Sequence, residues 1–151
     1  MELDKKDKQI LNLLQEDGRM KLKEIGRQVG LSIDSVNKRI KKMQGADVVK
    51  IGAFINPKAI GYELVASVSI KLHNVSEEEY KLFLDYLVKN PHTIEVISTL
   101  GQYDLMCVFI AKTTDELEII YRHVRHRFKD IIADWESDIN LKVHKFEEYS
   151  L

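Results

Sequence analysis

The chain has 151 residues, of which 44% are hydrophobic and 31% are charged, and its net charge is −1. No apolar run approaches the roughly 20 residues that a membrane-spanning helix needs, and the charged N-terminus lacks the apolar core of a signal peptide. The single cysteine, Cys107, excludes an intramolecular disulfide, so we expect a reducing, cytoplasmic location without membrane contact.

The charges are distributed unevenly along the chain. Residues 1–52 contain twelve Lys/Arg and eight Asp/Glu, whereas residues 53–151 contain eleven and sixteen. A basic first part on an acidic remainder indicates that nucleic-acid binding is confined to one module and that the other is repelled from phosphates. The alternative is that the charges are distributed by chance, and the sequence motifs distinguish between these two interpretations.

The first 52 residues have the pattern of three short amphipathic helices. Asp4 is the expected N-cap of the first helix and Ser32 that of the third. Gly30 suits a left-handed backbone position in the turn between the second and third helices. Gly26 allows a neighbouring segment of the same chain to approach closely. The predicted buried faces are Ile10, Leu11 and Leu14, then Leu22, Ile25, Val29 and Leu31, then Val36, Ile40 and Met43.

Two helices joined by Gly30-Leu31-Ser32 have the layout of a helix-turn-helix, whose second helix enters the major groove of DNA. The outward residues of that helix can read base edges, contact phosphates, or simply be solvated. The predicted DNA-binding set is Ser32, Asp34, Ser35, Asn37, Lys38, Arg39, Lys41 and Lys42.

Within this set the side chains suit different tasks. Ser35 and Asn37 carry donors and acceptors for base edges, and Lys38 can reach a guanine or a phosphate. Arg39, beside the inward face, is expected to hold a phosphate or a neighbouring carboxylate, whereas Lys41 and Lys42 suit positioning contacts to the backbone. Asp34 could accept from a cytosine, cap its own helix or reject wrong sites.

The remaining residues predict an α+β domain. After a short strand over Val48–Ile55 and a hinge around Asn56-Pro57-Lys58, the pattern alternates from Leu64 to Leu72 as in a half-buried strand. The later elements are a helix over Ser76–Asn90, strands over Ile94–Leu100 and Leu105–Ala111, a helix from Thr114 to about Phe128, and a strand over Trp135–Phe146. The βαββαβ order predicts a ferredoxin-like sandwich at 63–151, preceded by a linker at 53–62 and a helix-turn-helix domain at 1–52.

Both alternating sets of residues in Leu105–Ala111 are apolar. A strand of this kind needs cover on both faces, and one layer of helices covers only one. Self-association through the bare face of the sheet is the simplest solution, because a large exposed apolar patch is unusual. We therefore expect a homodimer.

Several motifs occur together and in order along the chain. They are Leu3-Asp4-x-x-Asp7-x-x-Ile10-Leu11, Asp17-Gly18-Arg19, Gly30-Leu31-Ser32-x3-Val36-x2-Arg39-Ile40, Asn56-Pro57-x2-Ile60-Gly61-Tyr62 and Gly101-x-Tyr103-Asp104. With them, the whole chain resembles the Lrp/AsnC family of feast/famine regulators. The resemblance implies an N-terminal winged helix-turn-helix and a C-terminal βαββαβ domain that dimerises, with dimers assembling into tetramers, octamers or larger discs. It also implies an amino acid or related small effector bound between dimers.

The residues Gly101-Gln102-Tyr103-Asp104 by themselves predict a hairpin turn. By the resemblance, the amides of this loop and Asp104 hold the α-amino or α-carboxyl group of an effector. The effector site is predicted to comprise Thr99, Gly101, Gln102, Tyr103, Asp104, Trp135 and Ser137.

The sequence departs from the family pattern at two places. Asp47-Val48-Val49 follows the third helix where the family usually has Gly-Val-Ile and a wing strand, and an acid there would face phosphates poorly. Trp135-Glu136-Ser137 stands where the family commonly has small hydroxyl residues beside the effector, so Trp135 is expected to narrow or fill that pocket.

No metal or cofactor site is predicted. His123 and His126 have the spacing of two helical metal ligands, but the surrounding arginines favour a solvated basic face. Cys107 lies in a strand that should be buried, which makes a nucleophilic role unfavourable.

The leading hypothesis is a sequence-specific transcriptional regulator that binds double-stranded DNA as a dimer and responds to a small effector. One alternative is a tetrapyrrole-processing enzyme on the same two-domain frame, in which His92, His123, His126 or His144 would line a cavity. The other is an architectural DNA-binding protein with little sequence preference.

Overall fold

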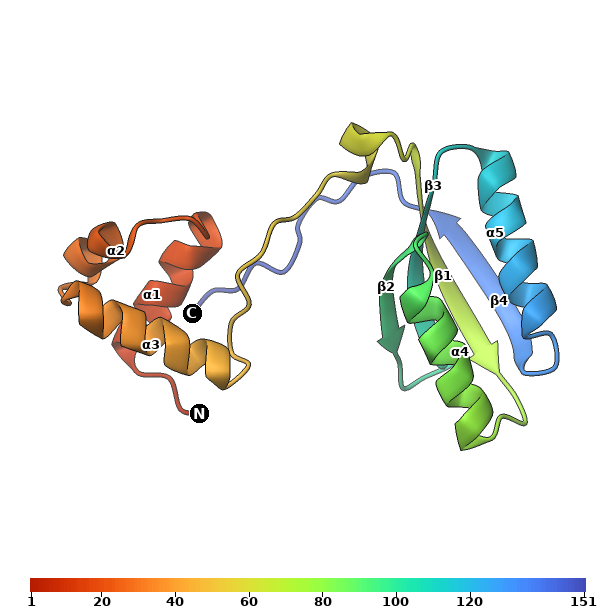
Figure 1. Cartoon of the computed structure of the whole chain (residues 1–151), viewed down its shortest axis with the longest axis horizontal. Coiled ribbons are helices and arrows are strands. Elements are labelled where there is room, and N and C mark those ends of the chain that lie inside the picture. The colour runs from red at the N-terminus through yellow and green to blue at the C-terminus, as the bar shows by residue number, and fades with distance from the viewer. The chain divides into compact units, whose positions relative to one another are not determined.

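The computed structural model describes residues 1–151 and divides into two compact units (Figure 1). The helical unit comprises Met1–Phe54 and His144–Leu151, and the sheet unit comprises Ile55–Val143. This division differs from the predicted one at two places, because residues 144–151 belong to the helical unit and most of the predicted linker belongs to the sheet unit.

Three helices form the helical unit: α1 (Lys5–Glu16), α2 (Leu22–Val29) and α3 (Ile33–Gly45). Each contributes one apolar face to a common core, as the spacing of the apolar residues predicts. The buried core residues are Ile10, Leu11, Leu14, Ile25, Val29, Val36, Ile40 and Met43, with Leu22 and Leu31 partly buried against them.

The ends of these helices follow the capping pattern of the sequence. The side chain of Asp4 accepts from the Asp7 amide and Asp7 reciprocates, and the Ser32 hydroxyl accepts from the Ser35 amide. Gly30 has φ +69°, the predicted left-handed position. A Cβ at Gly26 would lie 2.6 Å from the Leu31 carbonyl oxygen, so the turn between α2 and α3 requires glycine there.

The segment after α3 does not form the predicted strand over Val48–Ile55. Residues 48–55 lie in no strand, and the side chains of Phe54 and Ile55 are mostly exposed. The apolar composition was misleading because a strand also needs a neighbouring strand for its backbone hydrogen bonds, and none of the chain's four strands pairs with this segment.

Residues 144–151 pack within the helical unit. The Gln15 carboxamide on α1 bonds both backbone groups of Tyr149, donating to its carbonyl (3.1 Å) and accepting from its amide (2.8 Å). Asn12 donates to the Leu151 carbonyl (3.2 Å). The rings of Phe54 and Phe146 meet edge to face with centroids 5.4 Å apart. This tail therefore completes one surface of α1.

The sheet unit has the predicted βαββαβ order. It runs β1 (Leu64–Leu72), α4 (Glu77–Lys89), β2 (Thr93–Ser98), β3 (Leu105–Ala111), α5 (Thr114–Arg127) and β4 (Ile132–Ile139), after a short 3-10 helix at Pro57–Ile60. The strands form one antiparallel sheet in the order β2-β3-β1-β4, which makes β2 and β4 the edges. The α+β, ferredoxin-like prediction is confirmed.

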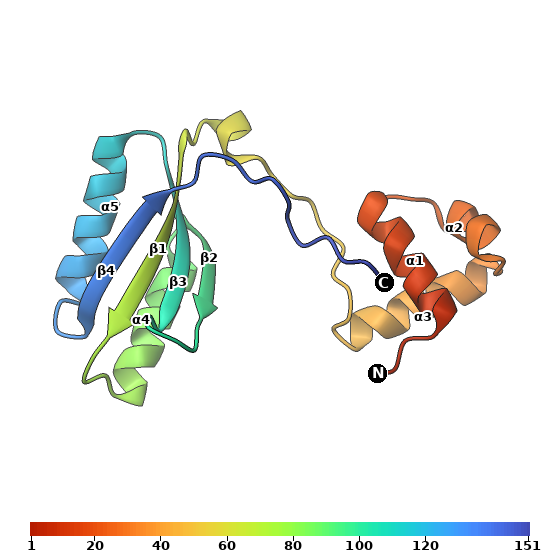
Figure 2. The same ribbon diagram turned by 180° about the vertical axis from the view of Figure 1, so that it is seen from behind.

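Both helices of this unit cover the same face of the sheet, and Figure 2 views the sheet from its other, open face. Phe83 and Leu87 of α4 and the buried face of α5 pack on the covered side. The buried strand residues there are Ala66, Val68, Ile70, Leu72, Leu105, Cys107, Phe109 and Ala111.

The last strand runs over Ile132–Ile139, so it begins before the predicted Trp135 and ends well before the predicted Phe146. Ile139 pairs with Ala66, near the start of β1, and the Asn140 amide makes one more bond to the Val65 carbonyl (2.8 Å). Only Leu64, the first residue of β1, lies beyond this point, so β4 ends and the chain continues into the helical unit. No helix has the length and apolar character needed to cross a bilayer.

Candidate DNA-binding helix and ligand-binding sheet

The predicted DNA-binding residues on the outer face of α3 differ in how exposed their side chains are. Asp34, Lys38, Lys41 and Lys42 are exposed, whereas Ser35 and Asn37 are half-buried. None of the three lysines forms a salt bridge within the chain, although Arg39 between them does. Three cations on one helix face are therefore available to a polyanion.

The N-terminus of α3 is organised by hydroxyl groups. The Ser32 hydroxyl accepts from the Ser35 amide (3.2 Å) and bonds the Ser35 hydroxyl (3.0 Å). Ser32 thus fixes the first turn of the helix as its cap, and Asp34 is not needed for that purpose. Both serines therefore lie at the N-terminal end of α3. This is the end that a recognition helix directs toward the bases.

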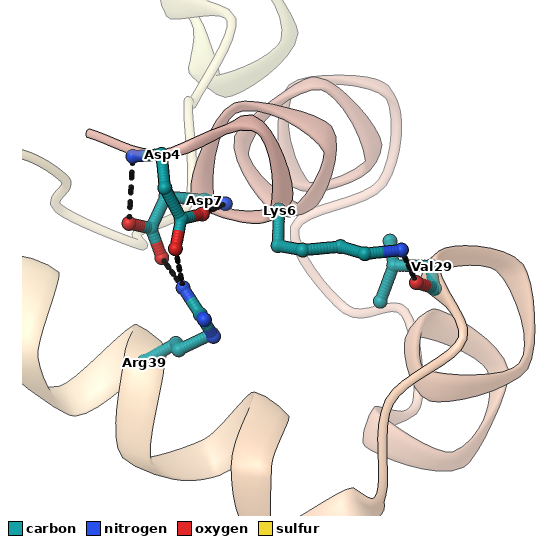
Figure 3. A network of polar contacts seen from close by, with 5 residues as sticks. All are labelled: Asp4, Lys6, Asp7, Val29 and Arg39. Carbon is teal, nitrogen blue, oxygen red and sulfur yellow. Dashed lines mark hydrogen bonds and ion pairs between the residues drawn. The ribbon is translucent and has the colours of Figure 1, made fainter.

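Arg39 binds carboxylates of its own chain (Figure 3). Its Nη1 lies 2.7 Å from Asp4 Oδ2 and 2.7 Å from Asp7 Oδ1, so it connects α3 to the N-terminus of α1. The Asp7 side chain is only 6% exposed. Of the two roles predicted for Arg39, the structure shows the neighbouring carboxylate.

This network also includes a contact that the sequence did not suggest. Lys6 donates to the Val29 carbonyl at the C-terminal end of α2 (Figure 3). A cation near the C-terminus of a helix is favourable, but here it comes from another helix, so spacing within α2 could not reveal it.

At the end of α3, Asp47 occupies a left-handed backbone position with φ +58°. Few residues other than glycine adopt this region, although aspartate and asparagine do so more readily than most. This accounts for the glycine that the family usually has at this point. The Asp47 carboxylate lies 3.4 Å from Lys50 Nζ, with both side chains exposed.

In the sheet unit, the predicted effector loop connects β2 to β3. The Thr99 hydroxyl donates to the Tyr103 carbonyl (2.7 Å), which closes the turn. The Asp104 carboxylate accepts from the Leu72 amide (2.8 Å) and lies 3.2 Å from Lys71 Nζ. These bonds, the amide first and Lys71 second, keep the pKa of Asp104 below its usual range. Asp104 is therefore already engaged in holding the loop.

Tyr103 extends toward the acidic residues of β4. Its hydroxyl donates to Glu136 (2.7 Å) and more weakly to Asp134 (3.4 Å). The bond to Glu136 raises the pKa of Tyr103 to about 12. Asp134 and Glu136 were missed as site residues, although the two-residue period of a strand places them on one face and Trp135 and Ser137 on the other.

Trp135 and Ser137 lie on the helix-covered face of the sheet, apart from the Tyr103 contact. The Trp135 ring packs against Tyr121 of α5 (centroids 5.2 Å) and against Phe109 (6.0 Å). The Ser137 hydroxyl bonds the Tyr121 hydroxyl (2.7 Å). The structure thus brings Thr99, Tyr103 and Asp104 together and places Trp135 and Ser137 on the opposite side of β4.

The open face of the sheet has an apolar and small-residue centre with acids toward its edges. Met106, Val108 and Ile110 of β3 lie beside Ser67 and Ser69 of β1, and Glu95, Asp134, Glu136 and Asp138 flank them. Val108 and Ile110 are only 7% and 5% exposed in the single chain. The apolar patch is therefore smaller than the strand pattern alone predicts.

The two histidines of α5 line different grooves. His123 borders one between α4 and α5, whereas His126 borders one between α5 and β4. Cys107 is fully buried, and burial raises the pKa of its thiol to about 12. The thiolate that a nucleophile needs is thus strongly disfavoured.

Comparison with known proteins agrees with both halves of this description. A model of the AsnC-type helix-turn-helix domain matches residues 3–44, and a model of the Lrp/AsnC ligand binding domain matches residues 65–148. The HTH-type transcriptional regulator FL11 of Pyrococcus furiosus is 35% identical over 150 residues, covering 95% of this chain and 92% of its own.

Solved structures show the same fold over nearly the full length. A transcriptional regulator of Neisseria meningitidis in complex with L-Met superimposes with a TM-score of 0.84 at 23% identity, covering 96% of this chain and 94% of that one. E. coli AsnC gives 0.79 at 25% identity and 99% coverage of both chains. The chain belongs to the Lrp/AsnC family of DNA-binding transcriptional regulators, whose members are not enzymes.

Proposed function

We propose that this regulator recognises specific DNA sequences through α3, as a homodimer whose DNA binding is coupled to an amino-acid effector. The observation that carries the DNA-reading role is the row of exposed, unpaired lysines on α3 beside the half-buried Ser35 and Asn37. Lysines supply phosphate contacts, while hydroxyl and amide groups discriminate base edges. With DNA as its partner, we place the protein in the cytoplasm.

The open face of the sheet is the proposed dimer interface. Its centre is apolar or small and its charged residues lie toward the edges, which is the usual anatomy of a protein interface. A dimer would present two copies of α3 to successive major grooves, roughly 34 Å apart. We expect sedimentation velocity to show dimers or larger assemblies, and Met106→Glu to shift them toward monomers. A monomeric wild-type protein at micromolar concentration would rule out this interface.

The proposed effector is an amino acid held near the loop of Thr99–Asp104. A related regulator of N. meningitidis was solved with L-Met. In this chain Tyr103, Asp134 and Glu136 place a hydroxyl and two carboxylates at the loop, which suits an α-amino group. Binding there would change affinity for DNA by biasing assembly, and DNA would change affinity for the effector equally.

The DNA-reading role is tested with Lys38→Ala combined with Lys41→Ala. If each lysine contacts one phosphate, the slope of log K against log salt becomes less steep by about 1.8. Lys81→Ala, an exposed lysine of α4 in the sheet unit, is the matched control and should leave the slope unchanged. An unaltered slope in the double variant would exclude these lysines as phosphate contacts.

Sequence specificity and effector response need a second experiment. Genome-wide binding, with and without a panel of amino acids, should give discrete sites whose occupancy changes with at least one of them. Uniform coating of DNA would instead support the architectural alternative. Discrete sites that respond to no amino acid would retain the DNA-reading role and reject the effector.

A further inference from the structure

A groove of the sheet unit lies between α5 and β4, apart from the DNA-binding face and, except for Asp134, from the residues around Tyr103. Its volume is about 710 Å³, within the range of small-molecule sites. The residues that matter for its chemistry are Tyr121, Arg122, Arg125, His126, Lys129 and Trp135. Because β4 is an edge strand, the groove is bordered on one side by a strand that pairs only with β1.

The groove collects positive charge in an otherwise acidic part of the chain. Residues 53–151 carry sixteen Asp/Glu and eleven Lys/Arg, yet three of those eleven, Arg122, Arg125 and Lys129, line this one groove. Arg125, His126 and Lys129 form no salt bridge, whereas the two lining acids are engaged. Glu118 lies 3.6 Å from Arg122, and Asp134 accepts from Tyr103 (3.4 Å). The cations that remain are free to meet an anion.

The groove also has an aromatic side with an unsatisfied donor. Tyr121 and Trp135 pack edge to face there, with centroids 5.2 Å apart. The Trp135 indole Nε1 is buried and has no hydrogen-bond partner in the chain. An indole nitrogen can only donate, so a buried one without an acceptor is uncommon.

We propose that this groove binds a small molecule with a multivalent phosphate group, of the nucleoside di- or triphosphate class. Several unpaired cations in one groove suit a multiply charged anion better than a single carboxylate, and guanidinium groups match phosphate oxygens in geometry. The aromatic side chains offer an apolar surface to a flat ring. The site differs from the proposed amino-acid site, since Trp135 and Tyr103 lie on opposite faces of the sheet and Asp134 alone is common to the two.

Trp135 allows a direct test, because it is the only tryptophan in the chain. The full-length protein is titrated with pyrophosphate, ATP and adenosine, with indole fluorescence and calorimetry as independent readouts. We expect saturable binding of ATP and pyrophosphate and at least tenfold weaker binding of adenosine. Absence of saturable ATP and pyrophosphate binding by calorimetry, or adenosine binding as well as ATP, overturns the proposal.

The lining cations are tested with Arg125→Ala combined with Lys129→Ala. This double variant should bind ATP at least tenfold more weakly, with circular dichroism unchanged, while Lys81→Ala, outside the groove, should bind as the wild type does. Equal affinities in all three proteins would reject the groove as the site.

DNA is the other source of the same phosphate chemistry. Short duplex DNA is therefore titrated into the Lys38→Ala/Lys41→Ala protein while Trp135 fluorescence is followed. If the duplex saturates the groove at a lower phosphate concentration than ATP, the small-molecule assignment is wrong. An ATP response that survives in this variant supports the groove site and is independent of whether α3 reads DNA.

Discussion

Arg39 shows at the residue scale how a DNA-binding motif uses arginine for its own architecture. The guanidinium joins α3 to two carboxylates at the start of α1, one of them almost fully buried. Removing one partner of a buried ion pair is costly, because the other charge then stays buried without compensation. Arg39 therefore joins α3 to α1, and the neighbouring lysines, which we propose contact DNA, stay outside this network.

Replacing Arg39 by alanine should lower the free energy of unfolding by about 2 kcal/mol, because Asp7 then stays buried without its cation. Chemical denaturation of the full chain measures this change. Combining Arg39→Ala with Asp7→Asn should cost less than the sum of the single changes. Lys38→Ala, one residue away and unpaired, should be nearly neutral; an equal loss in Lys38→Ala would show that the network is not the cause.

Asp47 offers the opposite case, a residue whose replacement should stabilise. Its φ of +58° is strained for a residue that has a Cβ atom but not for glycine. After the greater flexibility of glycine in the unfolded chain is subtracted, Asp47→Gly should stabilise by about 0.5 kcal/mol, whereas Asp47→Ala should destabilise by about 1 kcal/mol. Thermal unfolding of the two variants tests this difference in sign. A gain from alanine would exclude backbone strain at this residue.

The residues of the candidate site were only partly predictable. Gly101–Asp104 could be placed at a turn because the residue types of turns are local. The grouping of Trp135 with this loop came from the resemblance, and it ignored the alternation of faces along a strand, which points Asp134 and Glu136 toward Tyr103 instead. The partners of Arg39 are distant in sequence, so the motif could suggest a carboxylate but not name Asp4 and Asp7.

At the scale of elements, the turn between α2 and α3 depends on the close approach of the Leu31 backbone to Gly26. The Leu31 amide donates to the Gly26 carbonyl (2.9 Å), and the Leu31 carbonyl approaches the Cα of Gly26 so closely that no side chain fits. This contact sets the angle at which α3 leaves the turn. The helix that we propose reads DNA is thus positioned by a residue of α2.

Gly26→Ala should therefore destabilise the helical unit by about 1–3 kcal/mol, because backbone atoms have to move to accept the new methyl group. Hydrogen exchange of the α2 and α3 amides in the full chain should accelerate, with little change in the sheet unit. Gly45→Ala is the control, since a Cβ there meets nothing within 4 Å. Unchanged exchange in Gly26→Ala would mean that the turn can relax freely.

The elements themselves were largely predictable, because helical caps and alternating strands are local signals. Leu105–Ala111 was predicted with both ends correct. The failures, at Val48–Ile55 and at the end of the last strand, share one cause: whether an extended segment becomes a strand depends on a partner that lies elsewhere in the chain. Residue composition carries no information about that partner.

At the scale of the whole molecule, acid should weaken both units together. Hydrogen bonds and ion pairs hold the pKa of Asp4, Glu24, Glu79 and Asp104 below the usual range in the folded chain. The unfolded chain then binds more protons at low pH, so this contribution to stability is present above about pH 4 and is lost as the pH falls through the folded values.

Urea denaturation between pH 7 and pH 3 should accordingly show a free energy of unfolding that falls steadily below about pH 4.5. Asp104→Asn should reduce the steepness of this fall, because one depressed carboxyl group has been removed. Asp138→Asn, a carboxylate in no salt bridge, serves as the comparison. A stability that rises on acidification would contradict the assignment of these groups.

The attachment of the tail to α1 can be tested through Gln15, whose carboxamide makes both bonds to Tyr149. Gln15→Ala should accelerate hydrogen exchange of the Tyr149 amide about fivefold, since a hydrogen bond contributes about 1 kcal/mol. Glu16→Ala, the next residue on the same helix, should leave the exchange unchanged. Equal exchange in both variants would show that the carboxamide does not hold the tail.

The same tail has a consequence for how the protein is made. A ribosome synthesises the three DNA-binding helices first and the segment that packs on α1 only after the entire sheet unit. Domains generally fold in order as they emerge, so the sheet unit can fold while the helical unit still lacks its last segment. The DNA-binding unit is therefore complete only in chains that already carry the whole ligand-binding domain. A product of interrupted translation would contain the three helices without the segment that packs on α1.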